Sequence, residues 1–416
     1  MAEQTSSTPA EGSADAPLNL ASIFSPDIIA DPYPMYRALR EGSPVLELPD
    51  ANTIVLSRYH DVQTTLRDRT LGHADDSMMT EEQLAEINAN AAVKGLRETM
   101  LLKNPPDHTR LRGLVVKAFD ARRTEAMRER IRAIAHELVD GFIEAGSGDL
   151  VRLFTHPLPV IVICDMLGIP EADRAEFVQG SRVNGRLIDP SPMSPEEIEA
   201  SNRSSQESRA YFSGLCDERR SHPQDDLMTA LVQSETEHGT LTKNELTSNI
   251  SLLFAAGHET TVNLMGNALI ALYRNRDQLE LLKSELDRMP QAVEEFLRYD
   301  SSVQLSGRDA LEDTEVCGLK VPKGRSIITL LAAGNRDPEV FPDPDKLDIT
   351  REKVKPLSFG GGIHLCLGAQ LARIEADEAM RVLLERLPKL ELDDPDNPDW
   401  KDTITLRGVQ SLPAHW

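Results

Sequence analysis

The chain has few cysteines, few aromatic residues and no long apolar run. The four cysteines are Cys164, Cys216, Cys317 and Cys366. They are widely separated and form no CxxC pair, which excludes a dense disulfide framework and indicates reduced thiols in a cytoplasmic protein. The apolar runs PVIVIC and SLLFAAG are far shorter than the ~20 residues that span a bilayer. The N-terminus also lacks the basic start and apolar core of a signal peptide. We therefore expect no membrane partner.

Positive charge is scarce as well. Lys and Arg number 45 against 68 Asp and Glu, which gives a formal net charge of −23 at pH 7. Such a chain repels polyanions, so the composition argues against nucleic acid as a partner. Apolar residues make up 40% of the chain, the balance of a globular protein with a sizeable core. We expect a monomer with a soluble, acidic surface.

The chain divides into a short lead-in and one long folded part. Residues 1–20 are biased towards Ala, Ser, Glu and Pro, which predicts a disordered lead-in. Residues 31–41 read as a helix, and residues 43–58 alternate like a strand hairpin around turn residues. Helical patterns then dominate, and strand-like pieces return near the C-terminus. Because β segments stand at both ends, we expect residues 21–416 to form a single interlocked domain.

The longest helical signal lies in the second half of the chain. Thr242 and Glu245 have the spacing of a capping box, so this helix should begin near Lys243. The pattern continues to about Arg274, which corresponds to a length of roughly 48 Å. A helix at 289–300, short strand pieces, a proline-punctuated meander and a last helix follow. The predicted fold class is mainly α with a minor β subdomain.

The segment FGGGIHLCLG places three glycines before a single cysteine, Cys366, at the start of that last helix. A phosphate loop would need Lys and Ser or Thr after the glycines, and none is present. A buried core cysteine remains an alternative. A loop that enters a helix can stabilise a thiolate, and glycines let a flat group approach the backbone. A lone thiolate suits neither zinc nor an iron–sulfur cluster, but it suits a haem iron, and no CxxCH motif attaches the haem covalently.

This segment resembles the F-x-x-G-x-x-x-C-x-G signature of the cytochrome P450 family. The resemblance implies a cytochrome P450-like fold and a heme b (iron protoporphyrin IX) cofactor. It makes Cys366 the axial ligand of the metal and places Phe359 beside the sulfur. It also implies that Gly362 and Gly368 shape the loop, and that His364 reaches a haem propionate.

The segment FAAGHETTVN puts polar and helix-unfriendly residues in the middle of the longest helix. A harmless kink is one reading; the other is a local opening that admits a diatomic ligand beside an acid and a hydroxyl. The segment is similar to the [A/G]-G-x-[D/E]-T motif of the same family. By this resemblance Ala256 and Gly257 border the oxygen pocket. Glu259 and Thr260 are then the catalytic acid and alcohol, and His258 has no catalytic role.

Two further motifs are similar to supporting parts of the family. Glu295 and Arg298 match a structural E-x-x-R motif, which together with Asn335 and Arg336 would hold the thiolate side of the cofactor. Surface ion pairs at this spacing are common, so the motif alone carries little weight.

Three more basic residues are candidates for binding the propionates. His108 and Arg112 lie four residues apart on one helix face, where they could form charge-assisted hydrogen bonds. Arg308 matches a third propionate partner by resemblance. The alternative for each of the three is a solvated basic side chain.

Despite the acidic total, two stretches of the sequence are locally basic. Their residues are Arg110, Arg112, Lys117, Arg122 and Arg123 in the first, and Arg351, Lys353 and Lys355 in the second. If the family fold holds, both lie near the thiolate. We expect them to dock an acidic ferredoxin-type electron donor that works with its own reductase.

The resemblance extends from about Asp31 to the C-terminus. It implies a haem-thiolate monooxygenase that inserts one atom of O2 into a moderately hydrophobic small organic substrate. The segments Met78–Leu102, Val183–Ser205 and Ser301–Gly307, with the long helix near Leu253, are expected to form the substrate pocket. Three alternatives remain: a peroxide-driven haem-thiolate peroxygenase, a non-catalytic haem gas sensor, and a protein that binds no haem and buries Cys366 in its core.

Overall fold

The computed structural model describes residues 23, 25–119, 121–180, 186–189, 193–234 and 239–416. The predicted lead-in, residues 1–20, lies outside this part. None of the described helices is long and apolar enough to cross a membrane.

Helices make up most of the described chain. The N-terminal half contains α2 (Pro26–Ala30), α3 (Tyr33–Gly42), α4 (Tyr59–Thr65), α5 (Glu81–Ala89), α6 (Ala91–Arg97), α7 (Asp107–Ala118), α8 (Ala121–Ala126), α9 (Arg128–Phe142), α10 (Pro157–Leu167), α11 (Glu171–Gly180) and α12 (Pro195–Ser221). The C-terminal half contains α13 (Leu227–Val232), α14 (Lys243–Arg274), α15 (Arg276–Ser284), α16 (Met289–Tyr299), α17 (Leu331–Gly334) and α18 (Ala369–Arg386). The helical part of the predicted fold class is confirmed.

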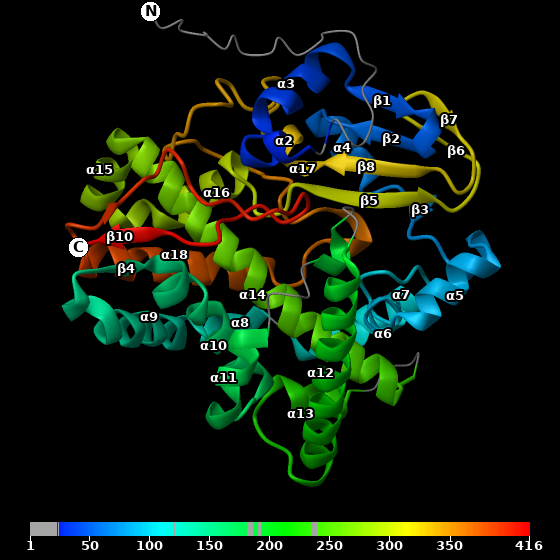
Figure 1. Cartoon of the computed structure of the whole chain (residues 1–416), viewed down its shortest axis with the longest axis horizontal. Coiled ribbons are helices and arrows are strands. Elements are labelled where there is room, and N and C mark those ends of the chain that lie inside the picture. Colours follow the sequence, from blue (N-terminus) through cyan, green and yellow to red (C-terminus); the bar gives the residue numbers. More distant parts are fainter. Residues whose placement is uncertain (1–22, 24, 120, 181–185, 190–192, 235–238) are drawn as a thin grey trace, which may run out of the picture.

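The long helix α14 runs through the middle of the molecule (Figure 1). Its predicted ends are confirmed at Lys243 and Arg274. The capping box is present: the Thr242 hydroxyl accepts from the Glu245 N–H at 3.2 Å, and the Glu245 carboxylate accepts from the Thr242 N–H at 2.9 Å. Helices α10, α12 and α18 pack against α14, and the residues near its C-terminal end are almost all buried. The sequence places α14 inside the core because it is apolar on several faces.

Strands from both halves of the chain share one sheet. The described part of the chain contains the strands β1 (Val45–Leu48), β2 (Thr53–Leu56), β3 (Leu71–Gly72), β4 (Ser147–Asp149), β5 (Leu305–Ala310), β6 (Thr314–Val316), β7 (Leu319–Val321), β8 (Ser326–Leu330), β9 (Glu391–Leu392) and β10 (Pro413–His415). The shared sheet consists of β1, β2, β3, β5 and β8. The predicted hairpin is β1–β2, and β2 pairs in parallel with β8, with Ile54 opposite Ile327. The order of this sheet is β1-β2-β8-β5-β3, and it lies with α3 at one side of the molecule, away from α12 and α13 (Figure 1).

A second small sheet brings the C-terminus back to the helical part. Strand β10 pairs with both β4 and β9 in antiparallel fashion. The segment between β9 and β10 passes along α14, where the Asn267 amide donates to the carbonyl of Arg407 at 3.1 Å. The C-terminal part of the chain therefore packs against the central helix α14.

Candidate functional site

Cys366 lies in the loop that leads into α18. Its N–H donates to the Phe359 carbonyl at 2.9 Å, which closes the loop on itself. Cys366 is an exposed residue, as are Ile363 and Leu365 at 39% and 49% exposure. Desolvation by surrounding protein raises the pKa of the Cys366 thiol, while the Gly368 N–H and nearby guanidinium groups act in the opposite direction.

The glycines of this loop have different roles. Gly362 has a φ of 64°, and a Cβ there would come within 2.2 Å of the Leu66 carbonyl oxygen. The glycine is therefore needed because the loop packs against the end of α4. At Gly368 a Cβ would meet nothing within 4 Å. The sequence analysis expects the glycines to leave space for a flat group. Gly368 fits this expectation, whereas Leu66 fills the space that a side chain at position 362 would need.

A buried polar network holds the chain just before the cysteine loop. Glu295 and Arg298 are both 0% exposed and form two hydrogen bonds, at 2.7 and 2.8 Å. Arg298 also donates to the Asn335 carbonyl at 3.0 Å, and the Asn335 side-chain amide donates to the Ser358 hydroxyl at 2.9 Å. Ser358 immediately precedes Phe359, so this buried pair fixes the start of the loop.

Arg336, the fourth residue expected in this support, contacts the neighbouring helix. Its guanidinium donates to the Tyr299 carbonyl and lies 4.0 Å from the centre of the Tyr299 ring. It pairs with Asp345 at 3.0 Å as well. The irregular segment that follows α17, the predicted meander, is thereby attached to the end of α16.

Basic side chains from four separate segments meet beside the cysteine loop. The His364 ring lies 4.5 Å from the His108 ring and 5.0 Å from the His73 ring, measured between centroids. Arg112 donates to the Leu365 carbonyl, and Arg308 is 6% exposed. The structure therefore brings together the four predicted residues. His73, which the sequence analysis missed, joins them.

The electrostatics of this cluster call for an anionic group. Burial, together with neighbouring cations, lowers the pKa of His73 to about 4, and burial lowers the pKa of Arg308 to about 10. Neither Arg112 nor Arg308 forms an ion pair within the described residues, and both ring nitrogens of buried His108 lack a well-formed hydrogen bond. Groups of this kind are normally paired when buried.

The residues at this site fit a haem. Two propionates would satisfy the cationic cluster, and the exposed apolar side chains of Ile363 and Leu365 suit a porphyrin face. The sulfur of Cys366 is the single soft donor of the loop, and no cluster of three or more His, Cys, Asp or Glu side chains suits a metal ion in the described part of the chain. A haem held by one thiolate is consistent with all of these features.

The polar centre of α14 is helical throughout. The predicted local opening is not a break, because α14 continues from Lys243 to Arg274. The Thr260 hydroxyl donates to the Ala256 carbonyl at 3.2 Å, the back-bond that threonine forms within helices. Gly257 faces α10, where a Cβ would lie 3.3 Å from Ile163. Buried His258, for which no catalytic role is expected, contacts the Phe254 carbonyl at 2.8 Å.

An apolar cavity of about 180 Å³ lies against this part of α14. Ala256, Glu259 and Thr260 line it from the helix. Parts of all four predicted pocket segments contribute, including Leu101, Leu187 and Val303, although residues 183–185 and 190–192 of the second segment lie outside the described residues. Leu406, from the C-terminal segment, also lines the cavity and was not predicted.

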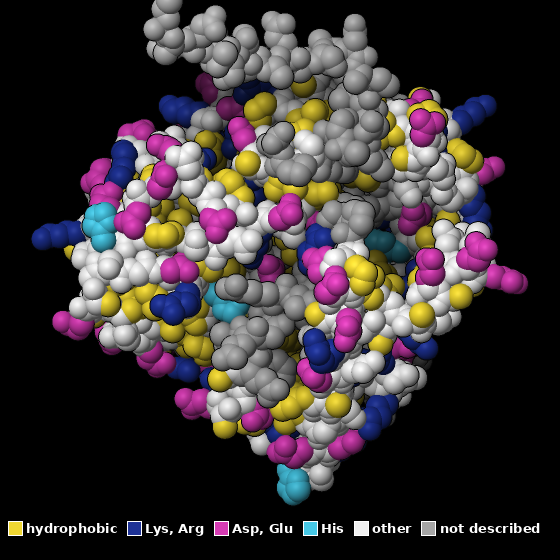
Figure 2. Space-filling model, in the orientation of Figure 1, with side chains coloured by type: hydrophobic (Ala, Val, Ile, Leu, Met, Phe, Trp, Pro, Cys, Tyr) yellow, Lys and Arg dark blue, Asp and Glu magenta, His cyan; other side chains and the backbone are white. Residues whose placement is uncertain are grey.

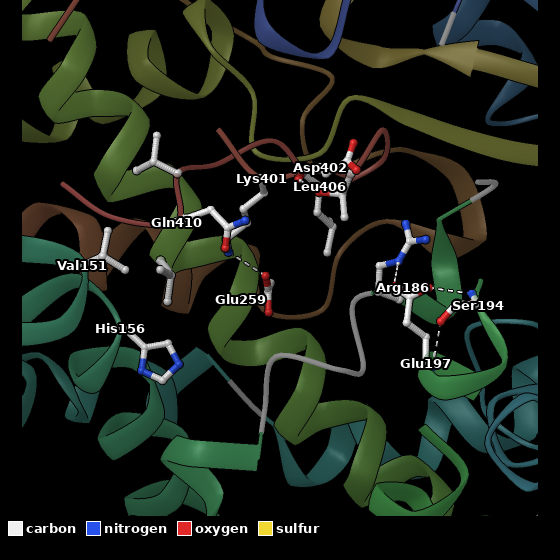
Figure 3. A pocket seen from close by; sticks show the side chains of 13 residues that line it. Val151, His156, Arg186, Ser194, Glu197, Glu259, Lys401, Asp402, Leu406 and Gln410 are labelled. Atoms are coloured by element: carbon white, nitrogen blue, oxygen red, sulfur yellow. Dashed lines mark hydrogen bonds and ion pairs between the residues drawn. The ribbon is translucent and has the colours of Figure 1, made fainter. Parts of the chain in front are cut away.

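A second, more polar cavity of about 450 Å³ lies on the other side of Glu259. Figure 3 shows Lys401 and Gln410 on one side and Arg186 and Glu197 on another, with Glu259 between them. The Lys401 ammonium lies 2.7 Å from the Glu259 carboxylate. No spacing pattern could have revealed this pair, because 142 residues separate its members.

The two basic stretches are partly neutralised by internal pairs. Arg110 pairs with Glu245, and Arg351 pairs with Glu295 at 3.2 Å while it donates to carbonyls of the meander. Arg122, Lys353 and Lys355 are exposed. Figure 2 shows that acidic and basic side chains are interspersed over the face that it presents.

Known proteins are similar to this chain over almost its whole length. The family model for Cytochrome P450 matches residues 50–409. The Vitamin D(3) 25-hydroxylase of Pseudonocardia autotrophica is 39% identical over 397 residues, which cover 94% of this chain and 95% of that protein. The Cytochrome P450 monooxygenase PikC of Streptomyces venezuelae is 37% identical over 398 residues, which cover 94% of this chain and 92% of that protein.

A solved structure shows the same fold. The crystal structure of P450BioI in complex with hexadec-9Z-enoic acid ligated acyl carrier protein superposes with a TM-score of 0.87 at 33% identity. The match covers 94% of this chain and 100% of that chain. Sequence and structure comparisons therefore agree on one family.

Proposed function

Because this chain belongs to the cytochrome P450 family, we propose that it inserts one atom of O2 into a moderately hydrophobic small molecule held in the apolar cavity. The enzyme is a monooxygenase that uses a haem iron. The reaction consumes O2, two electrons and two protons; one oxygen atom enters the substrate and the other leaves as water.

We assign the binding of the cofactor, heme b, to the residues around the cysteine loop. The Cys366 thiolate would hold the haem iron, with the Phe359 ring beside the sulfur. His108, Arg112, Arg308 and His364 would bind the propionates. Neither arginine forms an ion pair within the described residues, and both ring nitrogens of His108 and the Nε2 atom of His364 lack a well-formed hydrogen bond there, which supports this assignment. When bound, the haem supplies the redox chemistry that activates O2, and a thiolate ligand donates electron density that favours O–O cleavage.

The chain's own contribution is to bind the substrate and to move protons. Glu259 and Thr260 are adjacent on α14 and both line the apolar cavity. A carboxyl group and a hydroxyl at this place can pass a proton from solvent to the reacting oxygen, while the surrounding apolar side chains exclude other water. Ala256, one turn earlier, leaves space beside them, and Gly257 allows α14 to approach α10 closely.

The observation that carries the proposal is the composition of the cavity wall. Apolar residues such as Leu96, Phe212 and Leu252 form most of it, and the acid–alcohol pair lies among them on α14. An apolar cavity with a few polar groups is the usual form of a small-molecule site. The relative named for vitamin D(3) supports a moderately hydrophobic substrate.

We propose a ferredoxin with its reductase as the source of electrons, in the cytoplasm. We expect exposed Lys353 and Lys355, which precede the cysteine loop in the sequence, and exposed Arg122 to form a local positive surface. An acidic donor would be attracted to such a surface in spite of the negative total charge.

A spectroscopic screen tests this function. Purified holoprotein is titrated with apolar small molecules, and binding in the cavity should displace water and shift the iron from low to high spin. Compounds that cause the shift should be hydroxylated or epoxidised when a ferredoxin, its reductase and NADPH are added. Turnover that proceeds with hydrogen peroxide but not with the electron-transfer proteins would contradict the proposal and favour the peroxygenase alternative.

A further inference from the structure

Lys401 joins the C-terminal segment to the polar centre of α14. Its ammonium lies 2.7 Å from the Glu259 carboxylate and 2.8 Å from the Asn263 side-chain oxygen. Glu259 and Asn263 are four residues apart, so they lie on one face of the helix. The side chains of Lys401 and Glu259 are only 21% and 15% exposed. A largely shielded ammonium with two acceptors is held in one position, unlike a surface lysine.

The backbone beneath Lys401 is fixed as well. The Lys401 N–H donates to the Gly408 carbonyl at 2.9 Å, and Trp400 forms a β-bridge with Val409. Gly408 lies so close to α14 that a Cβ there would be 2.1 Å from the Asn263 side-chain oxygen. The hairpin therefore brings the lysine to the helix at a set distance.

Glu259 forms part of the wall between the two cavities. Among the described residues, only Glu259 and Leu406 line both of them. Thr260, the next residue on the helix, lines the apolar cavity. The polar cavity is large enough to hold water, and charged or polar side chains such as Arg186 and Glu197 stand around it (Figure 3).

We propose that Lys401 is a positioning residue for Glu259, and that the polar cavity is the route by which protons enter the site. The inference rests on the proposed role of Glu259 as the acid. Lys401 holds the carboxylate in the wall, where one side meets water and the other meets Thr260. The carboxylate takes up a proton from bulk solvent that water in the polar cavity relays, gives it up towards Thr260, and returns to its ion pair with Lys401.

Replacement of Lys401 tests this inference in the holoenzyme. Lys401→Met removes the charge and keeps much of the side-chain length, Lys401→Gln is a second neutral variant in case the first does not fold, and Lys401→Arg restores the cation. Lys389→Met, at an exposed lysine after α18, is the matched control. Glu259→Gln tests the acid itself. The measurements are kcat, KM, product per electron pair, the solvent deuterium isotope effect and the substrate dissociation constant from the spin shift.

Lys401→Met should lower kcat roughly tenfold, since a misplaced proton donor is costly, with more peroxide and a larger isotope effect. The substrate dissociation constant should stay unchanged, and Lys401→Arg should recover most of the coupling. A crystal structure of Lys401→Met should show the Glu259 carboxylate displaced from Asn263. If both neutral Lys401 variants keep normal coupling while Glu259→Gln is uncoupled, only the role of Lys401 is overturned. Normal coupling in Glu259→Gln would overturn the proposed proton route itself.

Discussion

At the scale of single residues, the charge state of Glu375 depends on its burial. This glutamate of α18 is 1% exposed, and burial raises the pKa of its carboxyl group to about 8. The Thr261 hydroxyl on α14 acts in the opposite direction but does not offset the desolvation. The folded protein therefore prefers the protonated form, whereas the unfolded chain ionises near the ordinary value of 4.5.

This difference predicts a pH dependence of stability. Between pH 4.5 and about 8 the native state binds more protons at Glu375 than the unfolded state does, so this residue's contribution to stability falls as the pH rises. Glu375→Gln removes the titration. The free energy of unfolding of the wild type, relative to the variant, should fall by roughly 2–4 kcal/mol between pH 5 and pH 8 in urea melts. A difference that does not change with pH would contradict the raised pKa.

Thr260 is predicted to control the coupling of the reaction. Thr260→Ala removes the hydroxyl next to Glu259 and its bond to the Ala256 carbonyl. Electron consumption should continue, but product per electron pair should fall roughly tenfold or more as peroxide forms. The spin-shift affinity for substrate should change little. Thr260→Ser keeps a hydroxyl and serves as the control; coupling as low as that of the alanine variant would remove the hydroxyl from the mechanism.

At the scale of elements, the end of α16 determines the position of the cysteine loop. Glu295→Ala leaves the guanidinium of Arg298 buried without its carboxylate, and breaking a buried pair costs about 3–5 kcal/mol. We expect loss of stability and of haem retention, measured by thermal unfolding and by the haem content of the purified protein. The control is Glu285→Ala, which breaks an exposed pair of the same spacing with Arg288 and should cost less than about 1 kcal/mol. Equal effects of the two variants would show that the buried network does not support the loop.

Local signals were sufficient to predict the elements that carry the site. The capping box at Thr242 fixes the start of α14, and the apolar pattern carries it to Arg274, because both depend on neighbouring residues. The parallel pairing of β2 with β8 was not predicted, since it joins segments about 270 residues apart, and periodicity gives no partner. The same reason explains why Lys401 and His73 were missed. Each acquires its role from residues distant in the sequence.

At the scale of the whole molecule, the net charge of −23 repels an acidic electron donor. The exposed basic residues before the cysteine loop favour its docking. The reduction rate with a ferredoxin should fall as ionic strength rises, because salt screens this attraction. Lys353→Gln combined with Lys355→Gln should slow reduction at low salt by several-fold, whereas Lys389→Gln should not. A rate that is independent of salt in the wild type would contradict docking at this surface.

The measurement that tests the central claim most directly is the ferrous–CO difference spectrum of the purified protein. Ligation by the Cys366 thiolate predicts a strongly red-shifted Soret band. Cys366→His, which offers a neutral nitrogen donor, should lose the red shift if it takes up haem. A haem-loaded wild type without the red-shifted band, or a Cys366→His protein that keeps it, would contradict the account.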